Sequence, residues 1–295
     1  MDKVDIAGRL ASVFLPIFGI VAVGFFYGRK HNPEMAMANR INMDIFIPAM
    51  VFAAMAGKSF DVQAYTPLAL AAFLLLTMCG ALAWGFARLA GVPPRTLVPP
   101  MMFNNSGNIG LPLAMLAWGE VAMPAAVILF VVENIYHFTA GARFLDPKAR
   151  LLTLWRVPVV FASLAGVGAA LLKLALWQPL MTGIRILGDI SIPLMLFSLG
   201  VRMTTVALDE WRLALISALL RPLLGVGLAL CLVRLMGLSG LEAAMLTVFG
   251  ALPPAVLNFM FAETYKQEPQ RVASIVLFGN LVALVTLPLA LALVL

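Results

Sequence analysis

Residues 97–118 read LVPPMMFNNSGNIGLPLAMLAW, which is a polar cluster in the middle of an apolar stretch. The cluster consists of Asn104, Asn105, Ser106, Gly107, Asn108, Gly110 and Pro112. A continuous helix gains nothing from these residues, because Pro lacks an N–H and clashes with the preceding turn, and each Gly costs about 1 kcal/mol relative to Ala. The pattern therefore predicts a helix that breaks near its centre.

The composition around this segment indicates a membrane protein. Of 295 residues, 62% are apolar and only 12% are charged, whereas a soluble domain has about 45–50% and about 25%. A water-soluble enzyme and a disordered chain are both excluded by these values. Apolar stretches predict an all-α polytopic protein with ten spans. They lie at 10–28, 41–57, 66–88, 97–117, 122–141, 157–176, 184–202, 213–234, 242–262 and 273–294.

The distribution of basic residues predicts the orientation. Of the 20 Lys and Arg residues, thirteen fall in the loops after the odd-numbered spans, which the positive-inside tendency places in the cytoplasm. Both termini are then outside, in the periplasm if the membrane is a bacterial inner membrane. The net charge of +6 reflects this topology, so nucleic acid is not an expected partner. We find no CxxC pair, HExxH or P-loop, and expect no metal ion or cofactor.

The two halves of the chain repeat one another. A shift of 145 residues lays Asp44-Ile-Phe-Ile-Pro-Ala-Met-Val-Phe52 on Asp189-Ile-Ser-Ile-Pro-Leu-Met-Leu-Phe197. The same shift lays the polar cluster on residues 249–258, so both halves are expected to break at the same place. Each half has five spans, an odd number, so the repeats are inverted: residues 1–141 and 157–295, joined by a short cytoplasmic connector at 142–156. Inverted repeats with paired interruptions are typical of secondary transporters, and the interruptions mark the transport site.

Broken backbone in a bilayer survives only where it lines a cavity or contacts protein. Two half-helix N-termini meeting at mid-membrane would favour an anion. Asn105, Asn108 and Asn258 can add hydrogen-bond donors without a charge. The expected substrate-binding set is Asn104, Asn105, Ser106, Asn108, Gly110, Pro112, Pro253, Pro254, Asn258, Asn134, Asn280 and Arg221.

Ionisable residues inside spans are costly and usually functional. Glu133 and His137 share a helix face and could pass a proton or form a structural hydrogen bond. Arg221 could neutralise a substrate carboxylate, although we favour a structural pairing with Glu133. Asn134 and Asn280 occupy matching places in spans 5 and 10, where they could face the crossover or link helices.

NNSGNIGLPL at 104–113, DISIPLMLFSLGVRM at 189–203 and LPPAVLNFMFAETYKQEP at 252–269 resemble the auxin efflux carrier family of bacteria. The resemblance implies the fold of the bile acid sodium symporters, with spans 4 and 9 crossing at their prolines. It also implies a scaffold of spans 1, 2, 6 and 7, a moving bundle of the other six, and a homodimer through the scaffold. Asn105 matches the family's substrate-contacting Asn, although this chain has Asn104-Asn105-Ser106 where the family has Pro-Asn-Thr, and lacks the long loop of the plant exporters.

These observations predict a secondary or facilitative carrier of small organic anions, such as malonate- or malate-like carboxylates or auxin-like weak acids. It would work by alternating access with an elevator-like motion. The alternative is a sodium-coupled organic anion symporter of the bile acid type. An intramembrane enzyme is disfavoured because the chain has only two His and no GxSxG, and the inverted repeat argues against a static channel.

Overall fold

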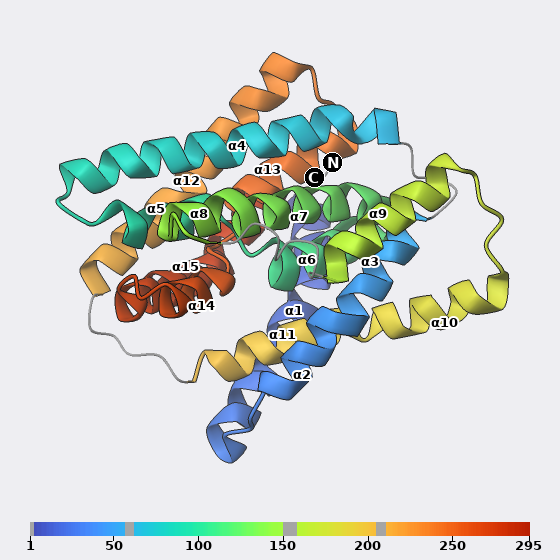
Figure 1. Cartoon of the computed structure of the whole chain (residues 1–295), viewed down its shortest axis with the longest axis horizontal. Coiled ribbons are helices and arrows are strands. Elements are labelled where there is room, and N and C mark those ends of the chain that lie inside the picture. The colour runs from blue at the N-terminus through green and yellow to red at the C-terminus, as the bar shows by residue number, and fades with distance from the viewer. Residues whose placement is uncertain (1–2, 57–61, 150–157, 205–210) are drawn as a thin grey trace.

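The computed structural model describes residues 3–56, 62–149, 158–204 and 211–295, and within these ranges the chain is helical (Figure 1). The first half comprises α1 (Lys3–His31), α2 (Ala36–Ile41), η1 (Asn42–Phe46), α3 (Ile47–Met55), α4 (Val62–Leu89), α5 (Pro94–Met102), η2 (Ser106–Gly110), α6 (Leu111–Trp118), η3 (Gly119–Ala122), α7 (Met123–Tyr136), η4 (His137–Gly141) and α8 (Ala142–Leu145). The second half comprises α9 (Pro158–Leu171), α10 (Gln178–Asp189), α11 (Ser191–Arg202), α12 (Trp211–Met236), α13 (Gly240–Ala251), α14 (Leu257–Thr264) and α15 (Pro269–Ala292).

A multi-pass membrane protein is confirmed by the length and apolar character of these helices. Six described segments can cross a bilayer: Ala7–His31, Gln63–Leu89, Ser106–Leu145, Gln178–Arg202, Trp211–Met236 and Pro269–Ala292. Two apolar helices, Pro158–Leu171 and Gly240–Ala251, are shorter. Helices lie over each of the ten predicted ranges, but length and composition identify fewer spans. The physical reason is interruption, because α5 has only 9 residues and α13 only 12.

The surface of the helices suits lipid better than water. Large apolar side chains on the outside include Leu15, Phe26 and Leu223, which are 74%, 68% and 71% exposed. In water such faces would cost about 25 cal/mol for each Å² of apolar surface, whereas in the hydrocarbon of a bilayer they cost nothing.

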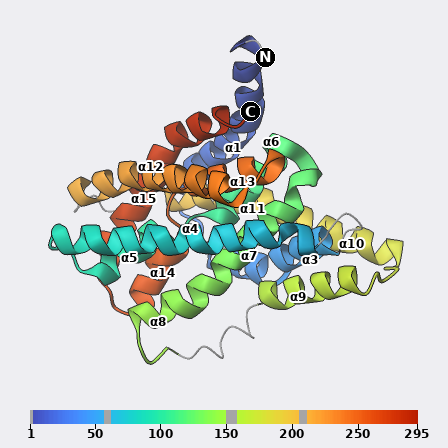
Figure 2. The same ribbon diagram turned by 90° about the horizontal axis from the view of Figure 1, so that it is seen from above.

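The helices pack as two groups. α1 lies along α11, and α3 packs against α9 and α10. In the other group α12 packs against α13, α15 and α4, and α4 packs against α5 and α7. The start of α1 and the end of α15 lie on the same side of the molecule (Figure 2).

Glycines allow two of these helix pairs to approach closely. A Cβ atom on Gly200 of α11 would lie 2.0 Å from the Val21 carbonyl oxygen of α1. A Cβ atom on Gly225 of α12 would lie 1.9 Å from the Gly250 carbonyl oxygen of α13. Small residues at such contacts let backbones pack directly in a membrane, and the second pair fixes α13 just before its interruption.

Candidate functional site

Two interruptions of the helices meet inside the molecule. α5 ends at Met102 and η2 begins at Ser106, while α13 ends at Ala251 and α14 begins at Leu257. The two extended segments between them form an isolated antiparallel bridge, Asn104 with Pro254. The N–H of Asn105 donates to the Pro253 carbonyl at 2.7 Å, and the N–H of Ala255 donates to the Phe103 carbonyl at 3.1 Å. We call this pair of segments the crossover.

Two asparagines add side-chain hydrogen bonds to carbonyl groups at the interruptions, each of which also accepts a backbone N–H. Asn104 Nδ2 donates to the Phe249 carbonyl at 3.0 Å, and Asn258 Nδ2 donates to the Phe103 carbonyl at 3.0 Å. Both side chains are buried. Each half of the chain thus supplies a side-chain donor to the other half, which lets non-helical backbone persist at membrane depth.

A second amide network joins the crossover to α15. Asn105 Nδ2 donates to Asn280 Oδ1 at 3.2 Å, and Asn280 Nδ2 donates to the carbonyls of Pro254 at 3.3 Å and Val276 at 2.7 Å. Asn134 follows a local pattern instead, because its Nδ2 donates to the Phe130 carbonyl one turn earlier, at 2.8 Å.

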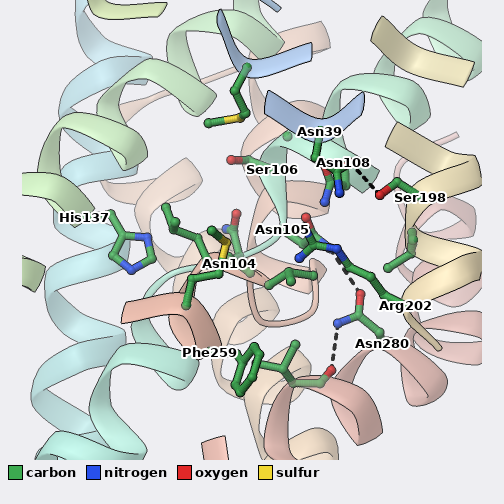
Figure 3. A pocket seen from close by; sticks show the side chains of 18 of the residues that line it. Asn39, Asn104, Asn105, Ser106, Asn108, His137, Ser198, Arg202, Phe259 and Asn280 are labelled. Carbon is green, nitrogen blue, oxygen red and sulfur yellow. Dashed lines mark hydrogen bonds between the residues drawn. The ribbon is translucent and has the colours of Figure 1, made fainter. Parts of the chain in front are cut away.

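A cavity of about 860 Å³ lies against the crossover. Eight predicted residues line it: Asn104, Asn105, Ser106, Asn108, Glu133, Asn134, His137 and Asn280 (Figure 3). The lining also includes parts of the π-helical turns η1, η2 and η4. Such turns are rare and frequently mark functional sites.

Six residues of the predicted binding set lie outside this lining: Gly110, Pro112, Pro253, Pro254, Asn258 and Arg221. Pro112 is the second residue of α6, which continues the π-helical turn η2 without a break. Pro253 and Pro254 form the crossover itself. The structure therefore gives these positions a part in the shape of the site, while the cavity wall is made by other residues.

The two ionisable residues of span 5 have separate surroundings. Ser106 Oγ donates to Glu133 Oε2, so the buried carboxyl contacts the first residue of η2. His137 stacks on Phe103 with ring centroids 4.0 Å apart and an angle of 7° between the rings. Its buried Nε2 has no hydrogen-bond partner. The His137 backbone N–H donates to the Glu133 carbonyl, but in the described ranges the two side chains do not hydrogen-bond to each other.

Arg221 is fully buried in α12, and its guanidinium donates to the Gly250 carbonyl at 2.7 Å. Gly250 lies in the last turn of α13, where a cation is favourable because helix C-termini carry partial negative charge. Among the described residues Arg221 and Glu133 form no ion pair within 4.0 Å. The hydrogen-bond partner of Arg221 is thus a helix end, where the sequence suggested Glu133.

Sequence reasoning missed the polar residues at the mouth of the cavity. Asn39, Arg40, Ser198, Arg202 and Gln270 all line it. Ser198 Oγ donates to Asn39 Oδ1 at 2.6 Å, joining α11 to α2. The charge count assigned Arg40 and Arg202 to cytoplasmic loops; the spacing of Ser198 and Arg202, one helical turn apart, is the signal that could have revealed a polar helix face.

No group of three or more His, Cys, Asp or Glu side chains that could hold a metal ion occurs in the described ranges. The polar groups of the cavity are mainly amides and hydroxyls, which bind by hydrogen bonding. Chemically, this set can hold and release a polar solute.

Comparisons with known proteins agree with this reading. Residues 148–291 match the family described as membrane transport protein. "Putative malonate transporter" of Rhizobium meliloti (strain 1021) is 26% identical, over 94% of this chain and 93% of its own. An uncharacterized transporter of Methanocaldococcus jannaschii is 22% identical, over 94% of this chain and 96% of its own. Auxin efflux carrier component 1 of Arabidopsis thaliana is 29% identical, over 52% of this chain and 27% of its own. The resemblance inferred from the motifs is confirmed, and these relatives are transporters, not enzymes.

Proposed function

We propose that this chain, which is similar in sequence to membrane transporters that include auxin efflux carriers, carries small organic anions across the membrane. The substrates would be malonate- or malate-like carboxylates or auxin-like weak acids, bound where the cavity meets the crossover. The observation that carries the proposal is this cavity of about 860 Å³, which ends on an interrupted helix.

The interrupted helix offers hydrogen-bond donors to an anion. Ser106, Gly107 and Asn108 line the cavity and form the first turn of η2. The N–H groups of a first turn have no partner within their helix, and they carry partial positive charge. The intrahelical bonds here start with the N–H groups of Ile109 and Gly110, which both donate to the Asn105 carbonyl. A carboxylate at this position would be bound by backbone donors and the Asn105 amide without the desolvation of a charged side chain.

Among the described residues, the lining of the cavity extends toward one side of the molecule. Its lining includes Arg40, Arg202, Glu263 and Gln270, which belong to the loops and helix ends that the positive-inside tendency places in the cytoplasm. On the other side of the crossover lies a gap of about 10 Å³ between α6 and α13, too small for a carboxylate. We assign this structure to a state open to the cytoplasm, with the outward path closed.

The packing supports alternating access by relative motion of two bodies. The helices of predicted spans 1, 2, 6 and 7 pack mainly with one another, and those of spans 3–5 and 8–10 do the same. We propose that the ten ranges form inverted repeats of five spans, that the first group is the scaffold and that the second is the moving bundle. Homodimerisation through the scaffold and insertion in the bacterial inner membrane with both termini outside complete the proposal.

Coupling to protons has a structural basis at Glu133. Its carboxyl accepts a hydrogen bond from Ser106, the residue that begins the proposed anion-binding turn. A change of protonation at Glu133 would therefore act directly on that turn.

Sodium coupling is the second candidate. The observation that favours it is a pair of buried amide oxygens at the crossover, Asn104 Oδ1 and Asn258 Oδ1, which lack hydrogen-bond partners. Hard cations bind such oxygens.

Counterflow in proteoliposomes tests the proposed function. Vesicles loaded with unlabelled malonate should accumulate external labelled malonate, and empty liposomes should not. An imposed pH gradient then tests coupling to protons, and replacement of Na⁺ by K⁺ tests coupling to sodium. Uptake without acceleration by internal malonate would contradict a carrier, because a channel shows no trans-stimulation.

A further inference from the structure

One half-buried cation lines the cavity. Arg202 is the last residue of α11, one turn after Ser198, and both line the cavity. The bond between Ser198 and Asn39 ties this face of α11 to α2. Figure 3 shows the Arg202 side chain reaching toward Asn105 and Asn280. Arg202, Asn105 and Asn280 thus line the same cavity.

The other charged groups near the cavity have different positions. The Arg40 side chain is 84% exposed and lies 3.6 Å from Asp44. Arg221 is outside the lining and donates to the Gly250 carbonyl. Of the two carboxylates in the lining, Glu133 accepts from Ser106 and Glu263 is exposed. Arg202 is half-buried, so it is the charge placed to meet a solute that already touches the crossover.

We propose that Arg202 binds the second carboxylate of a dicarboxylate whose first carboxylate sits at the crossover. This assignment rests on the proposed function and makes Arg202 the residue that separates dicarboxylates from monocarboxylates. The crossover end of the site is built from amides and a helix terminus, and the Arg202 end supplies a full positive charge.

The chemistry of the two ends of the proposed site explains why it would prefer a dicarboxylate to a monocarboxylate. A planar guanidinium matches a carboxylate with two parallel hydrogen bonds, and such charge-assisted bonds are stronger than neutral ones. An ester or methyl group at the same place would remove solvent from Arg202 without offering a negative charge. Sites built to hydrogen-bond a group reject analogues that lack it.

Malonate and its monomethyl ester provide a test, because they are close in size and differ by one negative charge. Binding to the purified full-length protein is measured by calorimetry at a pH where every free carboxyl is ionised. The variant is Arg202→Gln, and the matched control is Arg40→Gln, which removes the exposed cation of the same cavity. Arg202→Lys keeps the positive charge but loses the planar guanidinium, which can form two parallel hydrogen bonds with a carboxylate.

Wild type should bind malonate about 10- to 100-fold more tightly than the half-ester, the range expected for charge-assisted hydrogen bonds. In Arg202→Gln the ratio of the two affinities should fall to about one. Arg202→Lys should keep part of the preference, and Arg40→Gln nearly all of it. The melting temperature of each variant shows whether it is folded.

Equal binding of the two ligands by wild type would overturn the assignment, as would a preference that survives in Arg202→Gln. Loss of both ligands in Arg202→Gln and Arg202→Lys alike would also overturn it, because selectivity would then not reside in this residue. In each of these cases the proposed transport of organic anions would stand. A wild-type protein that binds neither ligand would remove the proposed function and this inference together.

Discussion

Asn258 provides the sharpest test of the crossover geometry, because the sequence suggests a substrate ligand and the structure a structural link. Its Nδ2 donates to the carbonyls of Phe103 and Ala255, each at 3.0 Å, and it lies outside the cavity lining. Asn258→Ala removes both bonds and leaves a gap where the side chain is buried. The loss should appear as reduced stability.

The size of the expected loss of stability follows from the number of hydrogen bonds that the Asn258 side chain makes. At about 0.6 kcal/mol for each bond in a membrane protein, two bonds give about 1 kcal/mol. The upper bound is about 3 kcal/mol, at about 1.5 kcal/mol for each bond. The Phe103 carbonyl keeps the Ala255 N–H as a partner at 3.1 Å, which favours the lower half of this range.

Thermal unfolding of the detergent-purified variant, without ligand, measures this effect, and Asn105→Ala is the matched control at the other interruption. Asn258→Ala should melt at a lower temperature than either wild type or Asn105→Ala. A variant as stable as wild type that no longer binds malonate would refute the reasoning, because Asn258 would then be a ligand.

Three further outcomes follow from the structure. Asn105→Ala should lower malonate affinity at least about tenfold, the value of one good hydrogen bond to a charged group; calorimetry measures the affinity. Its melting temperature should fall less than that of Asn258→Ala, because the Asn105 amide donates one hydrogen bond, to Asn280, and the Asn258 amide donates two. Glu133→Gln keeps an acceptor for Ser106 but cannot titrate, so uptake by proteoliposomes should no longer respond to an imposed pH gradient, and a retained response would place the coupling group elsewhere. Gly225→Ala should strongly reduce the yield of folded protein, because its Cβ would lie 1.9 Å from the Gly250 carbonyl oxygen. Gly227→Ala, on the same helix with open space around it, should be tolerated, and equal yields would contradict the close packing of α12 and α13.

The sequence predicts where the helices are interrupted but not which atoms repair the interruption. Polar and helix-breaking residues at 104–112 and 253–258 identify both places. In the first half the interruption lies at Phe103–Asn105, ahead of Gly110 and Pro112. Both of these residues lie within the helix that runs from η2 into α6. Whether Asn104 or Asn105 faces substrate depends on hydrogen bonds to residues about 150 positions away, which no local pattern encodes.

The charged residues of the site also divide into those that the sequence identifies and one that it does not. Charge counting recognised Glu133 and Arg221 as the deep ionisable residues, since charges within apolar stretches stand out. It could not recognise Arg202, because a cation at the end of a span looks the same whether it faces water or a cavity. Only the packing of α11 against α2 and the crossover distinguishes the two.

The positions of Glu133 and Arg221 lead to one more consequence for substrate recognition. Glu133 lies at the N-terminal end of an interrupted helix, through Ser106, and Arg221 lies at the C-terminal end of the other, through Gly250. Each end carries about half an elementary charge of the opposite sign, so the backbone compensates about half of the charge on each buried side chain when it is ionised. The crossover then contributes donors with little net charge, which suits a site that must both bind and release an anion. Discrimination by the number of charges on the solute has to come from outside the crossover, and Arg202 is the half-buried cation in the lining that is placed to provide it.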